Sequence, residues 1–382
     1  MKKISLIFVF ILLAFGKINA QSDYNFTGYL ENLQTVWIPK NSKQWIMMNS
    51  VINRFNFAWY LNTDFTMNIS MRNNFDYGQY FQIVPGYASF ITHDNGFMNL
   101  TKKIASNTSY VFYTNIDRLN LLYLKGNLEL QLGRQRINLG LNAVWTPNDI
   151  FNSSSFLNFD YVEKPGSDAI RLQYYTGAAS SVEFAYKLNH DKQVTAAGII
   201  KLNKWNYDFQ LLGGVMNKDY VLGGGWSGQI GGAGFSGEMT YFRNKKKFAD
   251  TNGVLVAAIS GNYTFPNSLF VQAEFLYNSA GKVGKAGGLT NLFSRTYSAK
   301  NLSPARYSVF GEVSYPITPL FKANVSAIFN PNDHSFYFGP YVDISLTEDI
   351  YFLITGQFFV GDNNSEWGNY GQFYYLRLKW SF

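Results

Sequence analysis

The three histidines, His93, His190 and His334, are the first residues to consider for chemistry, because nucleophilic catalysis pairs a hydroxyl with a base such as histidine. They stand far apart in the sequence, and none lies near a Gly-x-Ser-x-Gly turn. Clusters of histidines and carboxylates that would indicate a metal site are also missing. The acidic run at 362–366 either holds a hard cation through oxygen ligands or is a polar loop tip. The sequence therefore predicts neither an enzyme nor a cofactor.

Charged residues instead recur on one face of segments that alternate between apolar and polar side chains. Ile170, Leu172 and Tyr174, for example, alternate with Arg171 and Gln173. A period of two indicates a β-strand with two different faces. Segments of this kind follow one another through the chain, and no helical segment separates them. The pattern predicts an all-β protein in which one face of each strand carries the charges.

Strand length and aromatic content indicate that this sheet crosses a membrane. The strands can be drawn at about 10 to 12 residues, enough to cross the hydrocarbon layer at a tilt. Aromatic residues make up 18% of the chain and charged residues only 15%. Aromatic girdles mark the two interfaces of a membrane barrel, and the aromatics that cluster at strand ends here are Trp37, Trp59, Tyr60, Tyr174, Tyr175, Tyr263, Phe265, Tyr315 and Trp380. Because no backbone amide can stay unpaired in lipid, the sheet must close.

The turns set the number of strands. Short polar turns are expected near residues 61–64, 125–127, 177–180, 203–206, 230–232, 266–268, 316–319 and 347–349. Long loops are expected near residues 76–107, 138–168 and 278–304, all at the opposite end of the barrel. With both termini at the short-turn end, this gives a single antiparallel transmembrane β-barrel of about 18 strands, or of 16 if one hairpin is misplaced, and either number is even.

The alternation assigns the inward-facing charges. The basic set is Arg54, Arg118, Arg171, Lys187, Lys201, Arg306, Lys322, Arg377 and Lys379, and the acidic set is Glu129, Glu183, Asp208, Glu238, Glu274, Glu312 and Asp343. A lumen of such mixed sign is unlike the one-signed ring of an ion-selective pore. The candidate pore-lining residues are Arg118, Glu129, Arg171, Arg306, Glu312, Lys322, Asp343, Arg377 and Lys379.

The first twenty residues read as a secretory signal peptide. Lys2 and Lys3 precede an apolar stretch that runs to Phe15, and Ala20 is a small residue at the expected cleavage point. We therefore expect a signal peptide at 1–20 and one barrel domain at 21–382. Three of the 32 basic residues lie in the leader, so the mature chain carries 29 against 25 acidic residues, a net charge of +4 rather than +7.

The last strand carries a signature of its own. Apolar residues from Tyr374 to Phe382 alternate with Arg377 and Lys379, and the chain ends on an aromatic ring. This is similar to the C-terminal signature of bacterial outer-membrane proteins, in which the terminal phenylalanine is read by the barrel-assembly machinery. The resemblance implies that Trp380 and Phe382 form the assembly signal and that the strand pairs with the one near 26–37.

A motif lies within residues 128–175. It contains the runs Gly133-Arg134-Gln135-Arg136, Trp145-x-Pro147-Asn148-Asp149-Ile150-Phe151-Asn152 and Pro165-Gly166-Ser167-Asp168. It resembles porin-like barrels of the alginate-export type and their uncharacterised Bacteroidota relatives, over about an eighth of the chain. The resemblance implies an 18-stranded barrel with a folded-in loop that narrows the pore.

Loop 138–168 is the candidate constriction, because loops of this length are usually functional or disordered. Its asparagines, phenylalanines and tryptophan suit packing inside a lumen and stacking against sugars, although it could instead cap the barrel from outside. The candidate residues of this constriction are Arg134, Arg136, Trp145, Asn148, Asp149, Asn152 and Asp168.

Taken together, these features predict an outer-membrane, porin-like channel for passive passage of small polar solutes or saccharides. The alternative is a non-conducting barrel that serves as a scaffold for a lipoprotein or secretion partner. The expected partners are outer-membrane lipid, lipopolysaccharide, the barrel-assembly machinery and the solute. The basic residues are scattered, so no nucleic-acid partner is expected. The one basic cluster, 243–247, is either a solvated loop tip or a contact with anionic lipid headgroups.

Overall fold

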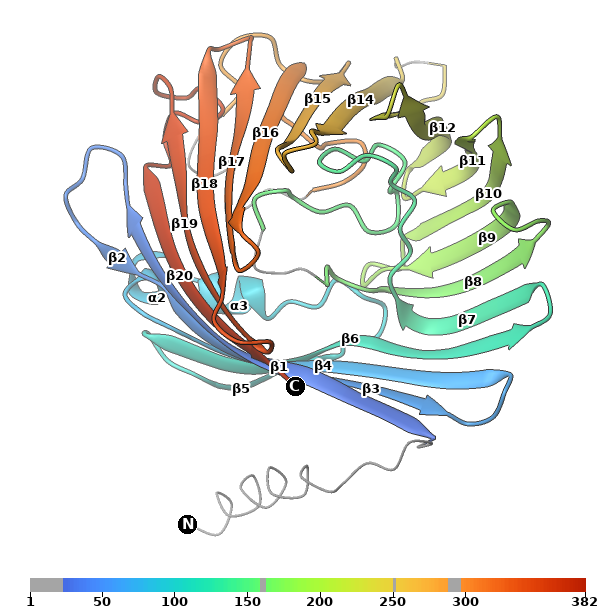
Figure 1. Cartoon of the computed structure of the whole chain (residues 1–382), viewed down its shortest axis with the longest axis horizontal. Helices are drawn as coiled ribbons and strands as arrows, with labels where there is room; N and C mark the ends of the chain where they lie inside the picture. Colours follow the sequence, from blue (N-terminus) through green and yellow to red (C-terminus); the bar gives the residue numbers. More distant parts are fainter. Residues whose placement is uncertain (1–22, 159–162, 250–251, 288–296) are drawn as a thin grey trace.

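The chain forms a barrel (Figure 1). The computed structural model describes residues 23–158, 163–249, 252–287 and 297–382. Its strands belong to one antiparallel sheet that curls round until its two edges pair. The predicted signal peptide at 1–20 lies outside the described residues, so its cleavage stays a prediction.

Eighteen strands make up the closed wall, which confirms the predicted number. They are β1 (Tyr24–Ile38), β3 (Asn49–Tyr60), β4 (Phe65–Tyr77), β6 (Tyr110–Lys125), β7 (Leu128–Gln135), β8 (Ser167–Tyr175), β9 (Ser181–Leu188), β10 (Val194–Lys204), β11 (Tyr207–Met216), β12 (Asp219–Ile230), β13 (Ala233–Asn244), β14 (Val254–Thr264), β15 (Phe270–Asn278), β16 (Tyr307–Thr318), β17 (Phe321–Asn330), β18 (Ser335–Ser345), β19 (Ile350–Val360) and β20 (Gln372–Ser381). The loops add β2 (Ile46–Met47), β5 (Thr101–Ser106), α2 (Tyr80–Ile83) and α3 (Tyr87–Ile91).

The barrel closes where β1 pairs with β20. Their register runs from Tyr29 opposite Ser381 to Ile38 opposite Gln372. Beyond it, Phe382 and Gly28 exchange two backbone hydrogen bonds of 2.8 and 3.0 Å. The Phe382 ring lies over Gly28, where a Cβ atom would come within 2.7 Å of a ring carbon. This pairing leaves neither edge of the sheet unpaired.

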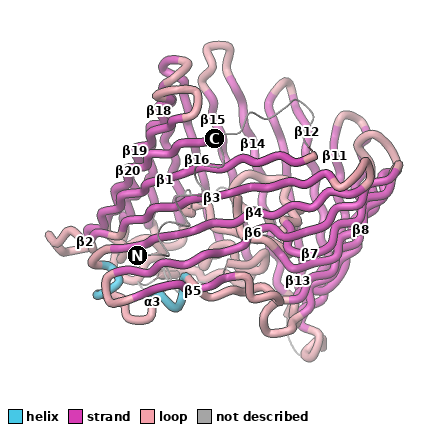
Figure 2. Tube along the Cα trace, turned by 90° about the horizontal axis from the view of Figure 1, so that it is seen from below, coloured by secondary structure: helices cyan, strands magenta, loops and turns pink. Residues whose placement is uncertain are grey.

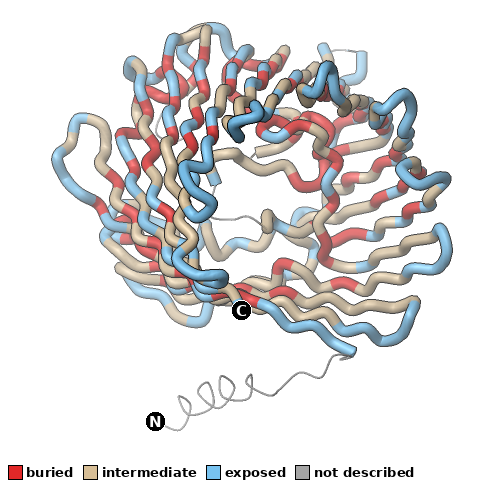
Figure 3. Tube along the Cα trace, in the orientation of Figure 1, coloured by how far each residue is buried: buried red, intermediate tan, exposed pale blue. Residues whose placement is uncertain are grey.

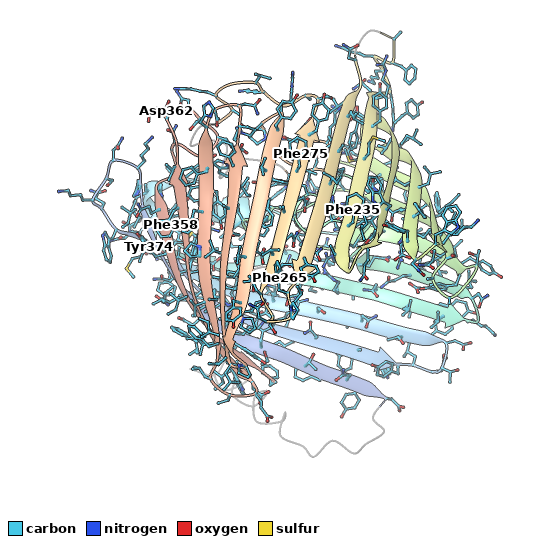
Figure 4. All side chains as sticks on the ribbon, turned by 45° about the horizontal axis from the view of Figure 1, so that its top comes forward. Phe235, Phe265, Phe275, Phe358, Asp362 and Tyr374 are labelled. Atoms are coloured by element: carbon cyan, nitrogen blue, oxygen red, sulfur yellow. The ribbon has the colours of Figure 1, made fainter. Side chains whose placement is uncertain are left out.

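Side chains along each strand alternate between lumen and exterior, as the sequence predicts. On β15, Glu274 is 2% exposed and the next residue, Phe275, is 40% exposed. Figure 3 shows the same alternation of buried and exposed positions along many strands. Figure 4 labels Phe275, Phe358 and Tyr374, outward-facing aromatics of β15, β19 and β20. The apolar exterior and the charged interior follow from this period of two.

All eight predicted short turns lie at the barrel end that carries the first described residue, Asp23, and the last, Phe382; this is called the proximal end. The turn between β12 and β13 shows the local reason: Gly231 and Gly232 have φ of 57° and 85°, and a two-residue hairpin turn needs positive φ at both positions. The three predicted long loops all lie at the opposite, distal end. The connections at that end also include the first outer loop, 39–48, and the second outer loop, 78–109.

The second outer loop extends the wall at the distal end. Its strand β5 pairs with the distal half of β6, while β7 pairs with the proximal half. Its helix α2 packs on the rim through Tyr80, whose ring lies 5.8 Å from that of Trp37. No helix in the described part of the chain is long and apolar enough to cross a membrane.

Candidate pore and constriction loop

The connection between β7 and β8, residues 136–166, runs inside the barrel and is called the constriction loop below (Figure 1). It first follows the lumen-facing side chains of β11 to β16, and later reaches β19 and then β1, β3 and β6. Residues 159–162 lie outside the described part. The loop that the sequence singles out therefore occupies the lumen and does not cap the barrel from outside.

Glu238 on β13 holds the first limb of the loop. One carboxylate oxygen accepts hydrogen bonds from the backbone N–H groups of Leu141 and Asn142, the latter at 2.6 Å. The other oxygen accepts the N–H of Asn148 at 2.9 Å. Glu238 is only 2% exposed. Hydrogen bonds to a charged acceptor contribute roughly 1.5–3 kcal/mol each, so this one side chain fixes two points of the loop.

Small residues beside Glu238 let the loop approach the wall. The hydroxyl of Thr240 donates to Asn148 Oδ1 at 2.6 Å, and that of Ser236 donates to Asn142 Oδ1 at 2.7 Å. On the neighbouring strand β12, a Cβ atom at Gly223 would lie 2.8 Å from Asn148 Oδ1. The Gly-rich sequence of β12 thus leaves space for the loop, a role that strand periodicity does not reveal.

Glu274 on β15 holds the next segment. Its carboxylate accepts the N–H of Trp145 at 2.7 Å and that of Val144 at 3.2 Å. The ring of Trp145 then packs edge-on against Phe310 of β16 at 6.4 Å, and Phe156 contacts the same ring at 5.0 Å. Trp145 is therefore part of the apolar contact between loop and wall.

Asn152 joins the two ends of the loop. Its side-chain oxygen accepts hydrogen bonds from the N–H of Ile137 at 2.9 Å and from the hydroxyl of Ser167 at 3.1 Å. Its amide nitrogen donates to the carbonyl of Pro165 at 2.7 Å. The residues of the 148–152 run therefore fix the loop's shape and its position on the wall.

Asp149 is a buried carboxyl group within that run. Its Oδ1 accepts the N–H of Asn152 at 3.2 Å. Burial raises the pKa of Asp149 to about 6, although the Asn152 N–H and the positive charges of Arg136 and Lys164 act in the opposite direction. Burial and the charge of Arg136 lower the pKa of Lys164. The positive charge of Arg136 therefore acts on both Asp149 and Lys164 within the loop.

The returning limb is held by the opposite wall. Arg118 on β6 donates to the backbone carbonyls of Glu163 and Lys164, at 2.5 and 3.0 Å. The Glu163 carboxylate accepts the hydroxyl of Tyr29 at 3.3 Å and lies 3.8 Å from Arg54 Nε. Contacts on facing walls thus hold the loop across the lumen.

Arg134 and Asp168 lie outside the lumen. They follow Leu132 and precede Ile170 at two-residue spacing, and these neighbours are 39% and 50% exposed on the outer face of the barrel. Arg134 binds Asp168 at 2.6 Å and Asp94 of the second outer loop at 2.8 Å. Burial acts to raise the pKa of Asp94, but the hydrogen bonds and charge of Arg134 leave it below its usual value. The pair therefore holds the two ends of the constriction loop from outside, instead of lining a passage.

The predicted pore-lining residues of the strands all face the lumen, and several form ion pairs there. Arg171 lies 3.1 Å from Glu129 and 2.8 Å from Glu183, which also pairs with Lys201 at 3.3 Å. Such pairing reduces the net field along this part of the wall.

The other predicted lumen charges contact an aromatic ring, an amide or a charge of opposite sign, or lie at the end of a strand. The Lys379 ammonium lies 4.0 Å from the centre of the Tyr29 ring, and Arg377 is 3.9 Å from Glu31. Glu312 accepts a hydrogen bond from Asn324. Of the remaining candidates, Lys322 and Asp343 are cross-strand neighbours on β17 and β18, and Arg306 lies just before β16.

The three histidines lie at the distal end of the barrel or in its loops. His93 and His190 come together at the distal end, with ring centres 5.4 Å apart, although they are distant in sequence. His334 lies in another loop, between β17 and β18. In the acidic loop, Glu366 is buried and accepts hydrogen bonds from Ser303 and Asn330. No group of three or more potential metal ligands occurs among the described residues.

Solved structures with the same architecture are bacterial barrels. The chain is similar to OccAB3 of Acinetobacter baumannii, with a TM-score of 0.59, 11% identity, and coverage of 94% of this chain and 99% of that one. It is also similar to the outer membrane protein OprD of Pseudomonas aeruginosa, with a TM-score of 0.58, 9% identity, and coverage of 94% and 93%. No family model and no curated protein sequence matches the chain.

At this level of identity, the likeness shows the fold alone. It supports a porin-like barrel, but it does not support the finer resemblance of residues 128–175 to the alginate-export type or to relatives in the Bacteroidota.

Proposed function

We propose that the protein is an outer-membrane, porin-like channel through which small polar solutes pass passively. The observation that carries this proposal is the constriction loop, which is held inside a closed barrel by wall residues such as Glu238, Glu274 and Arg118. A loop that only capped the barrel would not need buried carboxylates on the lumen wall. The apolar exterior fits a membrane-embedded barrel, and the neighbour OprD is described as an outer membrane protein.

The proposed solutes are small, polar and uncharged overall, saccharides among them. Ion pairs such as Arg171 with Glu129 and Glu183 leave the lumen without one dominant sign. Elsewhere the lumen wall carries amide and hydroxyl groups, such as Gln357 of β19 and Tyr375 of β20, whose hydroxyl donates to the Gln357 oxygen at 2.9 Å. Amide and hydroxyl groups both donate and accept hydrogen bonds, and this chemistry suits sugar hydroxyls.

Liposome swelling tests this function. Vesicles that contain the purified, refolded protein should swell quickly in a monosaccharide and progressively more slowly in longer oligosaccharides. Vesicles that contain heat-denatured protein serve as the control. Absence of swelling in sugars and in amino acids alike would reject the channel and favour the alternative, a scaffold for a lipoprotein or secretion partner.

Export and assembly belong to the same proposal. We propose that residues 1–20 are removed after export and that the barrel-assembly machinery recognises the last strand through Trp380 and Phe382. The position of Phe382, paired with Gly28 at the closing seam, supports a role in assembly.

Contact with lipopolysaccharide or another anionic lipid is proposed at the distal end of β12 and β13. Here a hollow on the outer face is lined by Tyr220, Leu222, Tyr241, Arg243 and Phe248. Arg243 lies over the Phe248 ring, with its guanidinium carbon 5.1 Å from the ring centre. An arginine among aromatic side chains at this edge suits a phosphorylated lipid headgroup.

A further inference from the structure

One sector of the outer face departs from the apolar pattern of the rest of the barrel. From β7 round to β20, the outward positions of the described strands are apolar, aromatic or glycine, except for a few residues at strand ends. Arg134 and Asp168 are the other exceptions, and the second outer loop covers them. On β3, β4 and β6, however, Asn53, Asn73 and Thr114 lie side by side in register. Asn32 and Gln34 on β1 continue this surface, and the five residues are called the polar row.

The polar row lies within the apolar belt and not at its edge. Toward the distal end it is followed by an aromatic and aliphatic row on the same three strands, and toward the proximal end by another. The distal row is Val51, Phe75 and Phe112, and the proximal row is Phe55, Met71 and Ile116. Figure 2 looks onto the wall in which β1, β3, β4 and β6 follow one another. Lipid chains would therefore surround the row on both sides.

Hydrogen bonds within the row satisfy only part of it. Thr114 donates to Asn73 Oδ1 at 2.7 Å, and Asn73 donates to Asn53 at 3.4 Å. Gln34 donates to Asn32 Oδ1 at 2.8 Å. Among the described residues, no hydrogen bond reaches the amide nitrogen of Asn32 or the side-chain oxygen of Gln34. Acyl chains offer no hydrogen-bonding groups, so a polar partner is needed in the membrane.

The two outer loops beyond this sector expose large apolar side chains. Trp45 in the first outer loop is 69% exposed, and Phe90 and Phe97 in the second outer loop are 57% and 53% exposed. Both loops leave the barrel from β1 and β4, the strands that carry the row. Apolar side chains thus stand where water is expected, directly beyond polar side chains that stand where lipid is expected. Both departures suit a protein surface that is covered by another protein.

We propose that the polar row, together with the exposed apolar residues of the first two outer loops, is the surface through which two copies of this chain associate in the membrane. Barrels inserted in one direction can be related only by an axis along the membrane normal, so each depth on one copy meets the same depth on the other. Asparagine and glutamine amides both donate and accept, and they are therefore complementary to their own kind. The row carries no net charge that would oppose such self-association.

Site-directed cross-linking in the membrane of expressing cells tests this surface directly. The chain has no cysteine, so Val51→Cys places a single thiol beside the row and leaves its amides intact. A short bis-maleimide should give a species of twice the mass of the mature chain. Ala257→Cys, which faces outward on β14, is the matched control and should give none. A product that contains a different protein, or no product from Val51→Cys, would overturn the proposal.

A second measurement separates association from folding. The wild-type barrel, extracted in a mild detergent, should have the mass of more than one chain by native mass spectrometry. The triple variant Asn32→Leu, Asn53→Leu, Asn73→Leu gives the row a lipid-like surface, and it should run as a monomer with unchanged sugar uptake in liposomes. A monomeric wild type, or a triple variant that stays oligomeric, would contradict a second copy at this surface and leave the channel function untouched.

Discussion

Glu238 Oε2 accepts a hydrogen bond from the backbone N–H of Asn148 at 2.9 Å, across 90 residues of chain. This contact fixes the constriction loop to β13 of the barrel wall, and no local sequence pattern specifies it. The other oxygen of the same carboxylate binds the loop again at Asn142. The position of the loop in the lumen therefore depends on a few buried side chains of the wall.

Glu238→Gln should loosen the constriction loop. The substitution replaces an acceptor of several charge-assisted hydrogen bonds, roughly 1.5–3 kcal/mol each, with an amide whose NH2 group faces other donors. Single-channel recordings should show larger and noisier currents than the wild type. Glu312→Gln removes one lumen charge that contacts Asn324 but not the loop, and it should add no noise. Equal noise in the two variants would contradict the role of Glu238.

The packing of the loop should become more stable as the pH falls toward 5. The folded pKa of Asp149 is raised to about 6, above the value of about 4 in an unfolded chain, so the folded loop binds the proton more tightly. The gain appears as the pH falls through 6, and it is complete near 4. Limited proteolysis of the loop should be slower at pH 5 than at pH 7.5. Asp149→Asn should remove this difference, whereas Asp191→Asn in the exposed loop after β9 should keep it.

Deletion of Phe382 should impair assembly more than conductance. The deletion removes two backbone hydrogen bonds at the closing seam and the ring that covers Gly28. The amount of heat-modifiable barrel in the outer membrane should fall severalfold, while the few assembled barrels conduct normally. Phe321→Ala, which removes another outward aromatic ring, should assemble much better than the deletion. Normal insertion of the truncated chain would contradict an assembly role for the last residue.

Arg134→Met should release the second outer loop. It leaves the carboxylates of Asp94 and Asp168 buried without their cation, and breaking a buried ion pair in this way costs about 3–5 kcal/mol. Thermal unfolding should shift downward, and proteolysis between residues 92 and 101 should become faster. The triple variant with Asp94→Asn and Asp168→Asn should recover part of the loss. A change no larger than that of Lys102→Met, an exposed cation on the same loop, would argue against the buried cluster.

Most of the wall could be predicted because strand faces and turns are local features. Alternation from Leu269 to Tyr277, for example, places Glu274 inside and Phe275 outside, as the structure has them. The turns follow from short polar or glycine-rich runs such as Gly231-Gly232. Local patterns of this kind are therefore sufficient to predict a barrel of 18 strands.

The contacts of the loops could not be predicted, because their partners lie far away in sequence. Arg134 and Asp168 belong to the outer face by alternation, yet their place in the motif at 128–175 made them candidates for the constriction. On the outer face, Arg134 also pairs with Asp94, which lies 40 residues earlier in the chain. Glu238 and Glu274 were assigned to the lumen correctly, but their role as acceptors for the loop depends on folding. The inward glycines of β12 are the sequence feature that indicates room for the constriction loop beside this strand.

Single-channel conductance of the purified protein in planar bilayers tests the central claim most directly, if the wild type is compared with a variant in which residues 140–158 are replaced by a short Gly-Ser linker. We predict an open current for the wild type and a current several times larger for the variant, because the loop is removed from the lumen while the wall stays closed. No current from either folded protein, or equal currents from both, would contradict a pore narrowed by this loop.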